Sequence, residues 1–396
     1  MHHLIFVCNA LDDATRLERG IVTDSPAASR KIFLLSQTLQ NVGIKVHVLS
    51  LGRGRQNGSC RYFHAKVVPV QKIPVIYLPF IHTPVISELF SMFSLIPVIW
   101  RMRKRNGKGT VIFYNRMPAY LLGLILARVL GFKTVLDLED GETQQNKWSP
   151  SNIRSRIWRG VFDAFCSGGA LIACSALGKM TILRPAQCCY GVVQPLPALA
   201  NWDALEIHVL LGGTVSRDTG AQLLMEVVRL LREEKPAWAE ALRFNVTGKG
   251  DCIEELRQIA SNEESPALVV HGRMIDEEYQ SFLSQIHVGL ALKPTMGDLA
   301  QTTFPSKVIE FASQGILVVT TDISDVREVL ADGALYLEED DPRLLIEKLR
   351  WITENREAAR KISLTGQRRV LEVCSPETMG PILRKFLFDC VAEPQV

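Results

Sequence analysis

Short apolar runs rich in β-branched residues alternate with amphipathic segments along almost the whole chain. This alternation is typical of parallel sheets, because each crossover between parallel strands needs a connecting segment of about helix length. In the first half, the apolar runs predict strands at 4–9, 45–51, 75–80, 110–115, 133–138 and 169–174. The amphipathic segments between them predict helices near 29–42, 86–104, 118–130, 151–165 and 175–183.

The second half follows the same pattern more regularly. Its predicted strands are 207–212, 243–247, 267–271, 287–292 and 316–320, and its predicted helices are 219–233, 251–261, 276–285, 305–314, 324–331 and 342–354. Residues 185–203 are rich in proline and alanine and are predicted to be a linker. We therefore expect an α/β fold with two Rossmann-like domains, 1–195 and 196–375. A last amphipathic helix within 376–396 is expected to pack back on the first domain.

Composition narrows the possible partners. Of the 396 residues, 47% are hydrophobic, which is enough for large buried cores. The 45 basic and 42 acidic residues leave a net charge of only +3, so we expect no nucleic-acid partner. None of the nine cysteines forms a Cys-x-x-Cys pair, and the eight histidines lack metal-ligand spacing. We therefore expect reduced thiols, no bound metal and a cytoplasmic location.

Neither the start of the chain nor its longest apolar tract indicates a membrane-spanning protein. The start lacks the charged region and the cleavage site of a secretory signal and instead predicts a buried strand. The longest apolar tract, 84–100, contains Glu88 and Pro97 and is shorter than the ~20 residues that a spanning helix needs.

The segment 302–315 predicts a helix whose start binds an anion. Pro305 suits the first helical position, with Thr303 as its cap. Backbone N–H groups and the positive end of the helix dipole would meet there, and Lys307 adds a charge. Glu310 lies three residues further on, on the same helix face. Because a carboxylate repels phosphate, we expect Glu310 to bind sugar hydroxyls.

Basic residues follow several predicted strands of the second domain. In doubly wound sheets, ligands bind outside the carboxyl ends of the strands. Four loops at this edge carry one cation each, Arg217, Lys249, Arg273 and Lys307, which together predict a diphosphate site. For Arg217, pairing with a surface acid is the alternative. The chain lacks both the Rossmann dinucleotide fingerprint and a Walker motif, which argues against NAD binding and ATP hydrolysis.

Five motifs in this half share the order and spacing of a known family. They are Gly-Gly-Thr-Val-Ser-Arg-Asp-Thr-Gly at 212–220, Val-Thr-Gly-Lys-Gly at 246–250, Val-His-Gly-Arg at 270–273, Phe-Pro-Ser-Lys-Val-Ile-Glu at 304–310 and Gly-Ile-Leu-Val-Val-Thr at 315–320. In these motifs the chain resembles the carboxyl-terminal domain of GT-B nucleotide-sugar glycosyltransferases, specifically the retaining family 4. Three positions depart from the usual pattern, since Thr302 replaces an acid and Thr214 and Thr219 replace basic residues.

The resemblance implies two Rossmann-like domains facing across a cleft, with a nucleotide-diphosphate sugar as substrate and no cofactor. It assigns the donor ribose to the glutamate at 310, the diphosphate to the cations and the base to the backbone near 272. The implied catalytic residues are Arg217, Lys307, Glu310, Asp140 and Glu139. The implied donor-binding residues are Gly213, Thr214, Gly248, Lys249, Gly272, Arg273, Met274, Thr303, Phe304, Pro305 and Ser306.

The first domain offers fewer candidates. Glu139, Asp140 and Glu142 follow an apolar strand, where family members often carry a polar residue near the reacting sugar. A solvated acidic turn fits them equally well. Ser29 and Arg30 begin a predicted helix and are placed to touch the acceptor or a donor phosphate, while a capping role fits Ser29 as well.

A basic and aromatic segment suggests contact with a membrane surface. Phe93 and Trp100 directly precede the four cations Arg101, Arg103, Lys104 and Arg105. Such a sequence is typical of an interfacial helix. A buried helix that ends in a solvated basic turn fits the same residues.

These observations predict a retaining, metal-independent glycosyltransferase. It would move a sugar from a nucleotide-diphosphate sugar to a glycan or lipid-linked acceptor at the inner face of the cell membrane, in bacterial cell-surface polysaccharide or lipopolysaccharide synthesis. Because catalysis would depend on stabilising the diphosphate leaving group, no nucleophile is assigned. The alternatives are a non-catalytic nucleotide-sugar-binding partner protein and a GT-B-like nucleotide-sugar epimerase.

Overall fold

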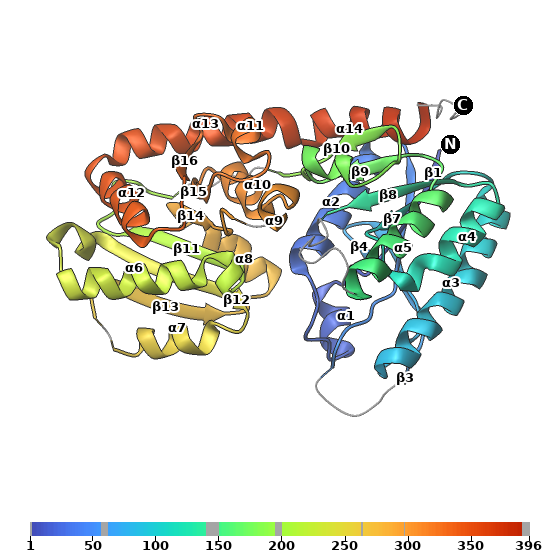
Figure 1. The fold of residues 1–396 in the computed structure, drawn as a ribbon, viewed down its shortest axis with the longest axis horizontal. Helices are drawn as coiled ribbons and strands as arrows, with labels where there is room; N and C mark the ends of the chain where they lie inside the picture. Colours follow the sequence, from blue (N-terminus) through green and yellow to red (C-terminus); the bar gives the residue numbers. More distant parts are fainter. Residues whose placement is uncertain are drawn as a thin grey trace. The chain divides into compact units, whose positions relative to one another are not determined.

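The chain folds into two compact units, each built around a parallel sheet (Figure 1). The computed structural model describes residues 2–56, 62–139, 150–194, 200–262, 264–296 and 298–389. The first unit consists of residues 1–192 and 376–396, and the second unit consists of residues 193–375. Two parallel α/β sheets confirm the predicted fold class.

The first unit contains an eight-stranded sheet in the order β10-β9-β8-β7-β1-β2-β5-β4. Its strands are β1 (His3–Cys8), β2 (Lys45–Ser50), β4 (Lys66–Val70), β5 (Ile73–Tyr77), β7 (Thr110–Tyr114), β8 (Lys133–Leu138), β9 (Ala170–Ile172) and β10 (Ala186–Cys188). All neighbours pair in parallel except β4, which is antiparallel to β5. The short strands β3 (Tyr62–Phe63) and β6 (Phe80–Ile81) form a separate antiparallel pair.

Helices flank this sheet. They are α1 (Asp13–Glu18), α2 (Pro26–Asn41), α3 (Pro84–Asn106), α4 (Leu121–Val129), α5 (Pro150–Phe165) and α14 (Pro376–Arg384), with 3₁₀ turns at Pro118–Tyr120 and Ser175–Lys179 and a π-helical turn at Lys385–Asp389. The last helix, α14, packs against α2, and Met379 and Leu383 are buried in the same apolar core as β1. Arg384 donates a hydrogen bond to the carbonyl of Val42 at 3.1 Å. The end of the chain therefore completes the core of the first unit.

The second unit contains a six-stranded, all-parallel sheet in the order β13-β12-β11-β14-β15-β16. Its strands are β11 (Ile207–Thr214), β12 (Leu242–Lys249), β13 (Ala267–Gly272), β14 (Val288–Ala291), β15 (Leu317–Thr321) and β16 (Ala334–Leu337). Strands buried on both faces carry near-continuous apolar runs, as in Leu-Val-Val-Thr-Thr of β15. The order reverses between β11 and β14, which is where ligands bind in sheets of this kind.

The helices of the second unit lie on both faces of its sheet. They are α6 (Ala221–Glu234), α7 (Ile253–Ala260), α8 (Asp276–Leu283), α9 (Asp298–Thr302), α10 (Ser306–Ser313), α11 (Val326–Leu330), α12 (Pro342–Glu354) and α13 (Arg356–Cys374), with 3₁₀ turns at Arg217–Thr219 and Ala237–Ala241. Helices α6, α7 and α12 share one apolar core with alternate strand residues such as Val209 and Phe244. Helices α10 and α13 pack on β15. Phe311 of α10 lies so close to Gly289 of β14 that a Cβ on Gly289 would be 2.3 Å from the Phe311 ring.

Several elements differ from the prediction. Strand β10 lies inside the predicted linker 185–203, because three residues are enough to pair with β9. The predicted helix 175–183 is only a 3₁₀ turn. Strand β4 was not predicted, since Lys66 and Pro69 interrupt its apolar pattern at an edge that tolerates both. Helix α13 was not predicted either, because its sequence is largely polar.

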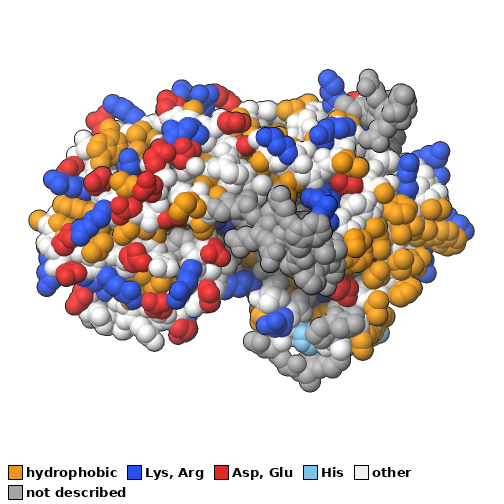
Figure 2. Space-filling view, viewed as in Figure 1, with side chains coloured by type: hydrophobic (Ala, Val, Ile, Leu, Met, Phe, Trp, Pro, Cys, Tyr) orange, Lys and Arg blue, Asp and Glu red, His pale blue; other side chains and the backbone are white. Residues whose placement is uncertain are grey.

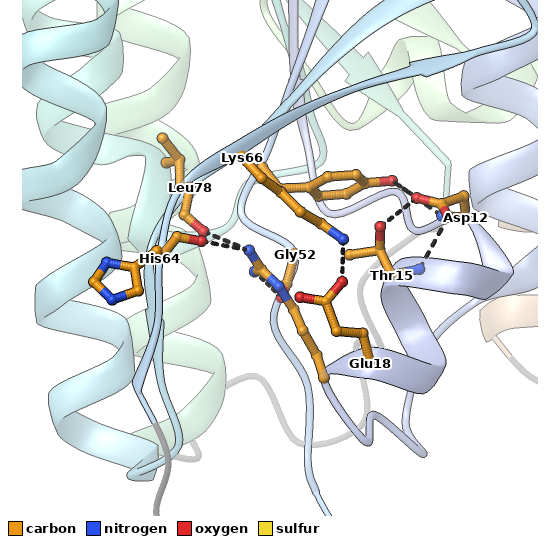
Figure 3. Close-up of polar contacts among 9 residues, drawn as sticks. Asp12, Thr15, Glu18, Gly52, His64, Lys66 and Leu78 are labelled. Atoms are coloured by element: carbon orange, nitrogen blue, oxygen red, sulfur yellow. Dashed lines mark hydrogen bonds and ion pairs between the residues drawn. The ribbon is translucent and has the colours of Figure 1, made fainter.

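One buried arginine organises the loops at the carboxyl edge of the first sheet. The guanidinium of Arg19 is 1% exposed and donates hydrogen bonds to three carbonyls, those of Gly52 at 2.7 Å, Leu78 at 3.0 Å and His64 at 3.4 Å (Figure 3). These carbonyls belong to the loops after β2 and β5 and to the turn between β3 and β4. Burial lowers the pKa of Arg19, so the carbonyl dipoles are needed to keep the charge stable there.

Asp12 holds the start of α1 beside this arginine. As the N-cap residue it accepts hydrogen bonds from the backbone N–H of Thr15 at 2.9 Å and from its hydroxyl at 2.6 Å (Figure 3). The hydroxyl of Tyr77 donates a third at 2.6 Å. Glu18, at the other end of α1, pairs with Lys66 of β4. The start of α1 is thus held by Tyr77 of β5 and its end by Lys66 of β4.

Replacing Arg19 should destabilise the first unit. In Arg19→Met the apolar stem is kept, but three buried carbonyls lose a charged donor, and we expect a loss of about 3 kcal/mol in the free energy of unfolding. The control is Arg128→Gln, which alters an exposed arginine of α4. This variant should change the free energy of unfolding by less than about 0.5 kcal/mol. Chemical denaturation measures both. Equal midpoints for the two variants would contradict an organising role of Arg19.

Candidate functional site

The carboxyl ends of β11 and β12 form the floor of the candidate donor site. The two strands pair in parallel, with Gly213 opposite Gly248 and Thr214 opposite Lys249. Val215 N–H donates to the Lys249 carbonyl at 2.8 Å, which continues the pairing beyond the strands. The predicted residues Gly213, Thr214, Gly248 and Lys249 therefore lie side by side at one edge of the sheet.

Two glycines permit this contact between the loops. Gly248 has a φ of +122°, and a Cβ there would lie 1.8 Å from the Gly213 carbonyl oxygen. A Cβ on Gly250 would lie 1.9 Å from the Val215 oxygen. The structure thus gives Gly248 a packing role between two backbones. Gly213 differs, because a Cβ there would meet only the end of the Lys307 side chain, at 3.1 Å.

Lys307 and Glu310 form the charged centre of this site. Lys307 Nζ lies 2.7 Å from Glu310 Oε2, and both side chains are mostly buried, with 20% and 14% exposed. Lys307 Nζ also donates to the Tyr279 hydroxyl at 3.2 Å and lies 5.0 Å from the centre of its ring. The prediction that Lys307 and Glu310 share one helix face is confirmed. The sequence predicted a separate ligand for each residue but did not predict the ion pair between them.

Tyr279 belongs to this group and was not predicted. It is located on α8, and a Cβ on Gly212 would lie 3.3 Å from its hydroxyl. Its sequence surroundings, three acids followed by an aromatic residue, resemble an ordinary amphipathic helix. No local signal distinguishes it, because its position beside Lys307 arises only when α8 folds against the strand ends.

The start of α10 differs by one residue from the prediction. The helix begins at Ser306, and Pro305 is the N-cap residue with extended backbone (ψ 99°), so Thr303 does not cap it. Proline keeps this extended conformation because its ring fixes φ while ψ stays open. Thr303, Phe304 and Pro305 are buried, whereas Ser306 is exposed. Of these four predicted donor residues, Ser306 alone offers its side chain to solvent.

The residues that depart from the family pattern have structural partners. The Thr219 hydroxyl accepts from Ser216 N–H at 2.9 Å and donates to the Thr214 carbonyl at 2.5 Å, which closes the turn before α6. A lysine at 219 could not make this cap. Thr302 ends α9 and is half-buried. Asp298, an acid four residues before Thr302, begins the same helix.

Arg217 lies in a cavity of about 240 Å³ on the second unit. The cavity is formed by the start of α6, the end of β14 and the loop after β16, with Arg217, Gly220, Glu226, Leu292, Lys293 and Asp340 in its lining. Lys307 is not among the described residues that line this cavity. Asp340 accepts from the backbone and hydroxyl of Thr295 at 3.0 and 3.1 Å. The structure thus gives Arg217 a second cation, Lys293, that the sequence pattern did not indicate.

The loop after β13 has room for a flat ligand. Gly272 has a φ of +72°, and a Cβ there would have only Arg257 Nη2 near it, at 3.5 Å. Arg273 and Met274 follow, both half-buried, before α8 begins at Asp276. This geometry fits the predicted approach of a base to the backbone. His271, one residue earlier, is instead occupied by a hydrogen bond to Asn245 at 3.1 Å.

In the first unit, a buried lysine and two carboxylates meet at the end of β8. Lys31 Nζ lies 3.3 Å from Asp137 Oδ1 and also pairs with Glu139. Asp137 is fully buried, and Glu139 is 19% exposed. Burial, opposed by Lys31 and assisted by Asp137, raises the pKa of Glu139 to about 7. Glu139 is therefore not part of a solvated turn, and it titrates near neutral pH.

Lys31 and Asp137 were not predicted. A carboxylate inside the apolar strand 133–138 was a usable signal, because a charge is buried only with a partner. Cys189 lies near the same group, and burial raises its thiol pKa to about 12, so it stays protonated. Across the described ranges, no set of three or more His, Cys, Asp and Glu side chains is placed to hold a metal ion.

The remaining candidates of the first unit have mixed outcomes. Ser29 is buried and accepts a hydrogen bond from Leu11 N–H at 3.0 Å, while Ser25 caps α2. The capping role predicted for Ser29 is therefore wrong, because Ser25 makes the cap. Arg30 is half-buried in the first turns of α2. Asp140 and Glu142 lie outside the described residues.

Helix α3 presents an apolar stripe to solvent. Ile86, Leu89, Phe93 and Trp100, spaced by three, four and seven residues, are all exposed, and apolar side chains gather over α3 and α4 in Figure 2. Lys104 lies over the Trp100 ring, with Nζ 3.8 Å from its centre. Arg101 and Arg105 are exposed too, and Arg103 bonds the Leu130 carbonyl. No helix in the described part of the chain is long and apolar enough to span a bilayer.

Comparison with known proteins agrees with this geometry. Residues 206–355 match the family described as Glycosyl transferases group 1. The chain is also similar to a curated protein of Arabidopsis thaliana, a subunit of phosphatidylinositol N-acetylglucosaminyltransferase. The two are 25% identical over 324 residues, which covers 78% of this chain and 67% of that protein.

Solved structures share the fold over nearly the whole chain. Sucrose-phosphate synthase from Thermosynechococcus elongatus has a TM-score of 0.68 at 13% identity, with 98% of this chain and 100% of that chain covered. Anabaena Alr3699/HepE in complex with UDP-glucose gives 0.68 at 12% identity with the same coverage. WaaG, a glycosyltransferase involved in lipopolysaccharide biosynthesis, gives 0.64 at 12% identity, again with 98% and 100% covered.

The fold is therefore that of GT-B glycosyltransferases, and the predicted resemblance is confirmed. Within this fold, residues 206–355 are the part of the chain that matches the family Glycosyl transferases group 1.

The packing role of Gly248 can be separated from ligand binding. Gly248→Ala forces a Cβ onto the Gly213 carbonyl, and we expect it to lower the free energy of unfolding by about 3 kcal/mol or more. The matched control is Gly272→Ala, which also has a positive φ but open space, and should cost only about 1 kcal/mol. Thermal denaturation without ligand measures both. A Gly248→Ala variant as stable as Gly272→Ala would contradict the packing role.

Proposed function

We propose that the protein transfers a sugar, with retention of configuration, from a nucleotide-diphosphate sugar to a glycan or lipid-linked acceptor. The observation that carries this proposal is the group of Lys307, Glu310 and Tyr279 at the carboxyl ends of β11 and β12. A cation and a carboxylate held together at the point where the strand order reverses suit a ligand that has both a diphosphate and vicinal hydroxyls.

In this proposal each charged group has a distinct role. Lys307 and the backbone at the start of α10 stabilise the negative charge that grows on the diphosphate as the glycosidic bond breaks. Glu310 accepts hydrogen bonds from the ribose hydroxyls, and the open backbone at Gly272 receives the base. Tyr279 keeps Lys307 in place through its hydroxyl and ring. Since these groups supply the stabilisation electrostatically, the proposed reaction requires neither a metal nor a protein nucleophile.

Arg217 and Glu139 complete the proposal with separate contributions. Arg217, with Lys293 in the same cavity, provides a further cationic contact for the donor. Glu139 is proposed to face the reacting sugar, together with Asp140. With its pKa near 7, Glu139 can hold or release a proton at neutral pH, which suits a group that contacts a hydroxyl in both states.

The names of similar proteins suggest which donor and acceptor to test first. Alr3699/HepE binds UDP and UDP-glucose, and the Arabidopsis relative is named for N-acetylglucosaminyl transfer to phosphatidylinositol. We infer that a UDP-sugar is the first donor to test. A lipid-linked acceptor in cell-surface polysaccharide or lipopolysaccharide synthesis is the proposed acceptor class.

Titration with UDP, GDP, ADP and dTDP tests the donor site. We expect at least one nucleotide to raise the melting temperature, and Glu310→Ala and Lys307→Met to weaken its binding about tenfold or more, since each removes a charged contact. The matched controls are Glu357→Ala and Lys361→Met, which alter an exposed ion pair on α13 of the same unit. No shift with any of the four nucleotides would refute the donor site.

Sugar transfer separates the enzyme from the alternative functions. With the nucleotide that binds, the corresponding nucleotide sugar should release labelled sugar in the presence of membrane extract or water, and Glu310→Ala should reduce that release. Binding without release would instead indicate a nucleotide-sugar-binding partner protein, and a change of sugar stereochemistry without release would indicate an epimerase.

We also propose that α3 contacts an anionic membrane surface. An exposed apolar stripe of Ile86, Leu89 and Phe93 that ends in basic residues has the arrangement of an interfacial helix. Each basic residue near an anionic surface contributes about 1 kcal/mol. Such contact would bring the first unit to a lipid-linked acceptor.

Charge removal on α3 tests the membrane contact. A variant with Arg101, Arg103, Lys104 and Arg105 changed to glutamine should lose sedimentation with vesicles containing phosphatidylglycerol, because it lacks four cations. The matched control changes four basic residues of α13, Arg360, Lys361, Arg368 and Arg369, all exposed. Equal vesicle binding by the two variants would show that α3 is not the contact, and neutral phosphatidylcholine vesicles should bind neither.

A further inference from the structure

A second cavity lies on the first unit and has no role in the donor site. Its volume is about 320 Å³, and it is located where the loops after β1 and β2 meet β6 and the start of α3. Nine described residues line it, and they include two arginines and a histidine but no carboxylate. The polar members are Asn9, Thr23, Arg53, Arg55, His82, Thr83 and Ser87. Because arginines and hydroxyl groups line the cavity, it suits an anion that can also accept hydrogen bonds from hydroxyls.

Arg53 is fixed in this cavity by its backbone. Asn9 Nδ2 donates to the Arg53 carbonyl at 2.8 Å, and Arg53 N–H donates to Asn9 Oδ1 at 2.9 Å. The Arg53 side chain is only 15% exposed, and burial lowers its pKa. Its carboxylate neighbour, Glu88, is 3.9 Å away and therefore beyond hydrogen-bond distance. Glu88 forms an ion pair with Arg53 at this distance but accepts no hydrogen bond from it, so a phosphate oxygen in the cavity would add hydrogen bonds that Glu88 does not make.

The second arginine is also held in place. Arg55 N–H donates to Thr23 Oγ1 at 2.8 Å, and the Arg55 carbonyl accepts from Val22 N–H at 3.0 Å. Between the two arginines, Gly54 packs so tightly that a Cβ would lie 2.4 Å from Ile21 Cγ2. Arg19 holds the same loop through the Gly52 carbonyl. The loop that carries both arginines is therefore built into the unit before any ligand binds, which reduces the entropic cost of binding.

An apolar surface begins directly beside the cavity. Thr83 and Ser87 line the cavity at the start of α3, and Ile86 and Leu89 on the same turns are exposed. Phe93 continues this surface one turn further along the helix. An anion in the cavity would thus have an apolar path next to it, which a purely polar ligand would not use.

We infer that this cavity binds the phosphate group of a lipid acceptor, with the acyl chains along the exposed face of α3. This inference rests on the proposed function, since it specifies the acceptor of the same transfer. Arg53 and Arg55 contact the phosphate oxygens as forked donors, and Thr83 and Ser87 lie where the glycerol or first sugar begins. A soluble phosphate ester shares the anionic part of this chemistry but lacks the apolar part.

Calorimetric titration with three probes tests the inference. Dihexanoyl phosphatidic acid has both parts, inorganic phosphate has only the anion, and dihexanoylglycerol has only the chains. The phosphatidic acid should bind most tightly, and Arg55→Gln and Arg53→Gln should each weaken it about tenfold. Arg128→Gln, which alters another exposed arginine of the first unit, is the matched control and should bind as the natural protein does.

Each outcome has a defined meaning. Equal binding of dihexanoylglycerol and phosphatidic acid would overturn the phosphate site, and so would full binding by Arg55→Gln, whose exposed side chain is not needed for folding. Inorganic phosphate binding as tightly as phosphatidic acid would overturn the lipid part. The nucleotide-induced rise in melting temperature should be unchanged in Arg55→Gln. Absence of that rise in the natural protein, with phosphatidic acid still bound, would refute the donor site and leave the cavity assignment intact.

Discussion

Parallel strands bring all their following loops to one edge, and the backbone groups of those loops must find partners in very little space. The two units meet this constraint differently. In the second unit, glycines let one loop lie directly on the next, as Gly248 does on Gly213. In the first unit, a buried guanidinium, Arg19, supplies hydrogen bonds to carbonyls of three separate segments. The floor of the donor site depends on the first arrangement, and the loop that carries Arg53 and Arg55 depends on the second.

Sequence periodicity predicted the two sheets well because strands buried on both faces are nearly continuous apolar runs. It failed to predict the short strand β10 and the edge strand β4, because hydrogen bonding to a neighbouring strand, and not an apolar run in the sequence, forms these two strands. The same limit applies to the site. Lys307 and Glu310 share one helix, so their spacing predicted a shared face. Tyr279 and Lys31 reach their partners only through tertiary packing, and no spacing in the chain encodes that.

Lysine–carboxylate pairs occur at the strand ends of both units, and their surroundings differ. Lys307 has one carboxylate, Glu310, beside an aromatic ring. Lys31 lies between two carboxylates, and burial, opposed by Lys31 and assisted by Asp137, raises the pKa of Glu139 to about 7. The first arrangement places one cation beside one carboxylate, which suits recognition of a ligand that carries both a diphosphate and hydroxyl groups. The second leaves a carboxyl group close to its titration point, which suits contact with a group that gains or loses a proton.

The packing of α14 has a consequence for biosynthesis. Met379, Leu383, Phe386 and Leu387 are buried in the core of the first unit, although the whole second unit precedes them in the chain. A ribosome therefore releases most of the first unit early and these core residues only after the whole second unit. Until then an apolar surface beside α2 stays uncovered, and the second unit can fold before the first is complete. A nascent chain of this topology needs chaperone protection most in the interval before α14 emerges.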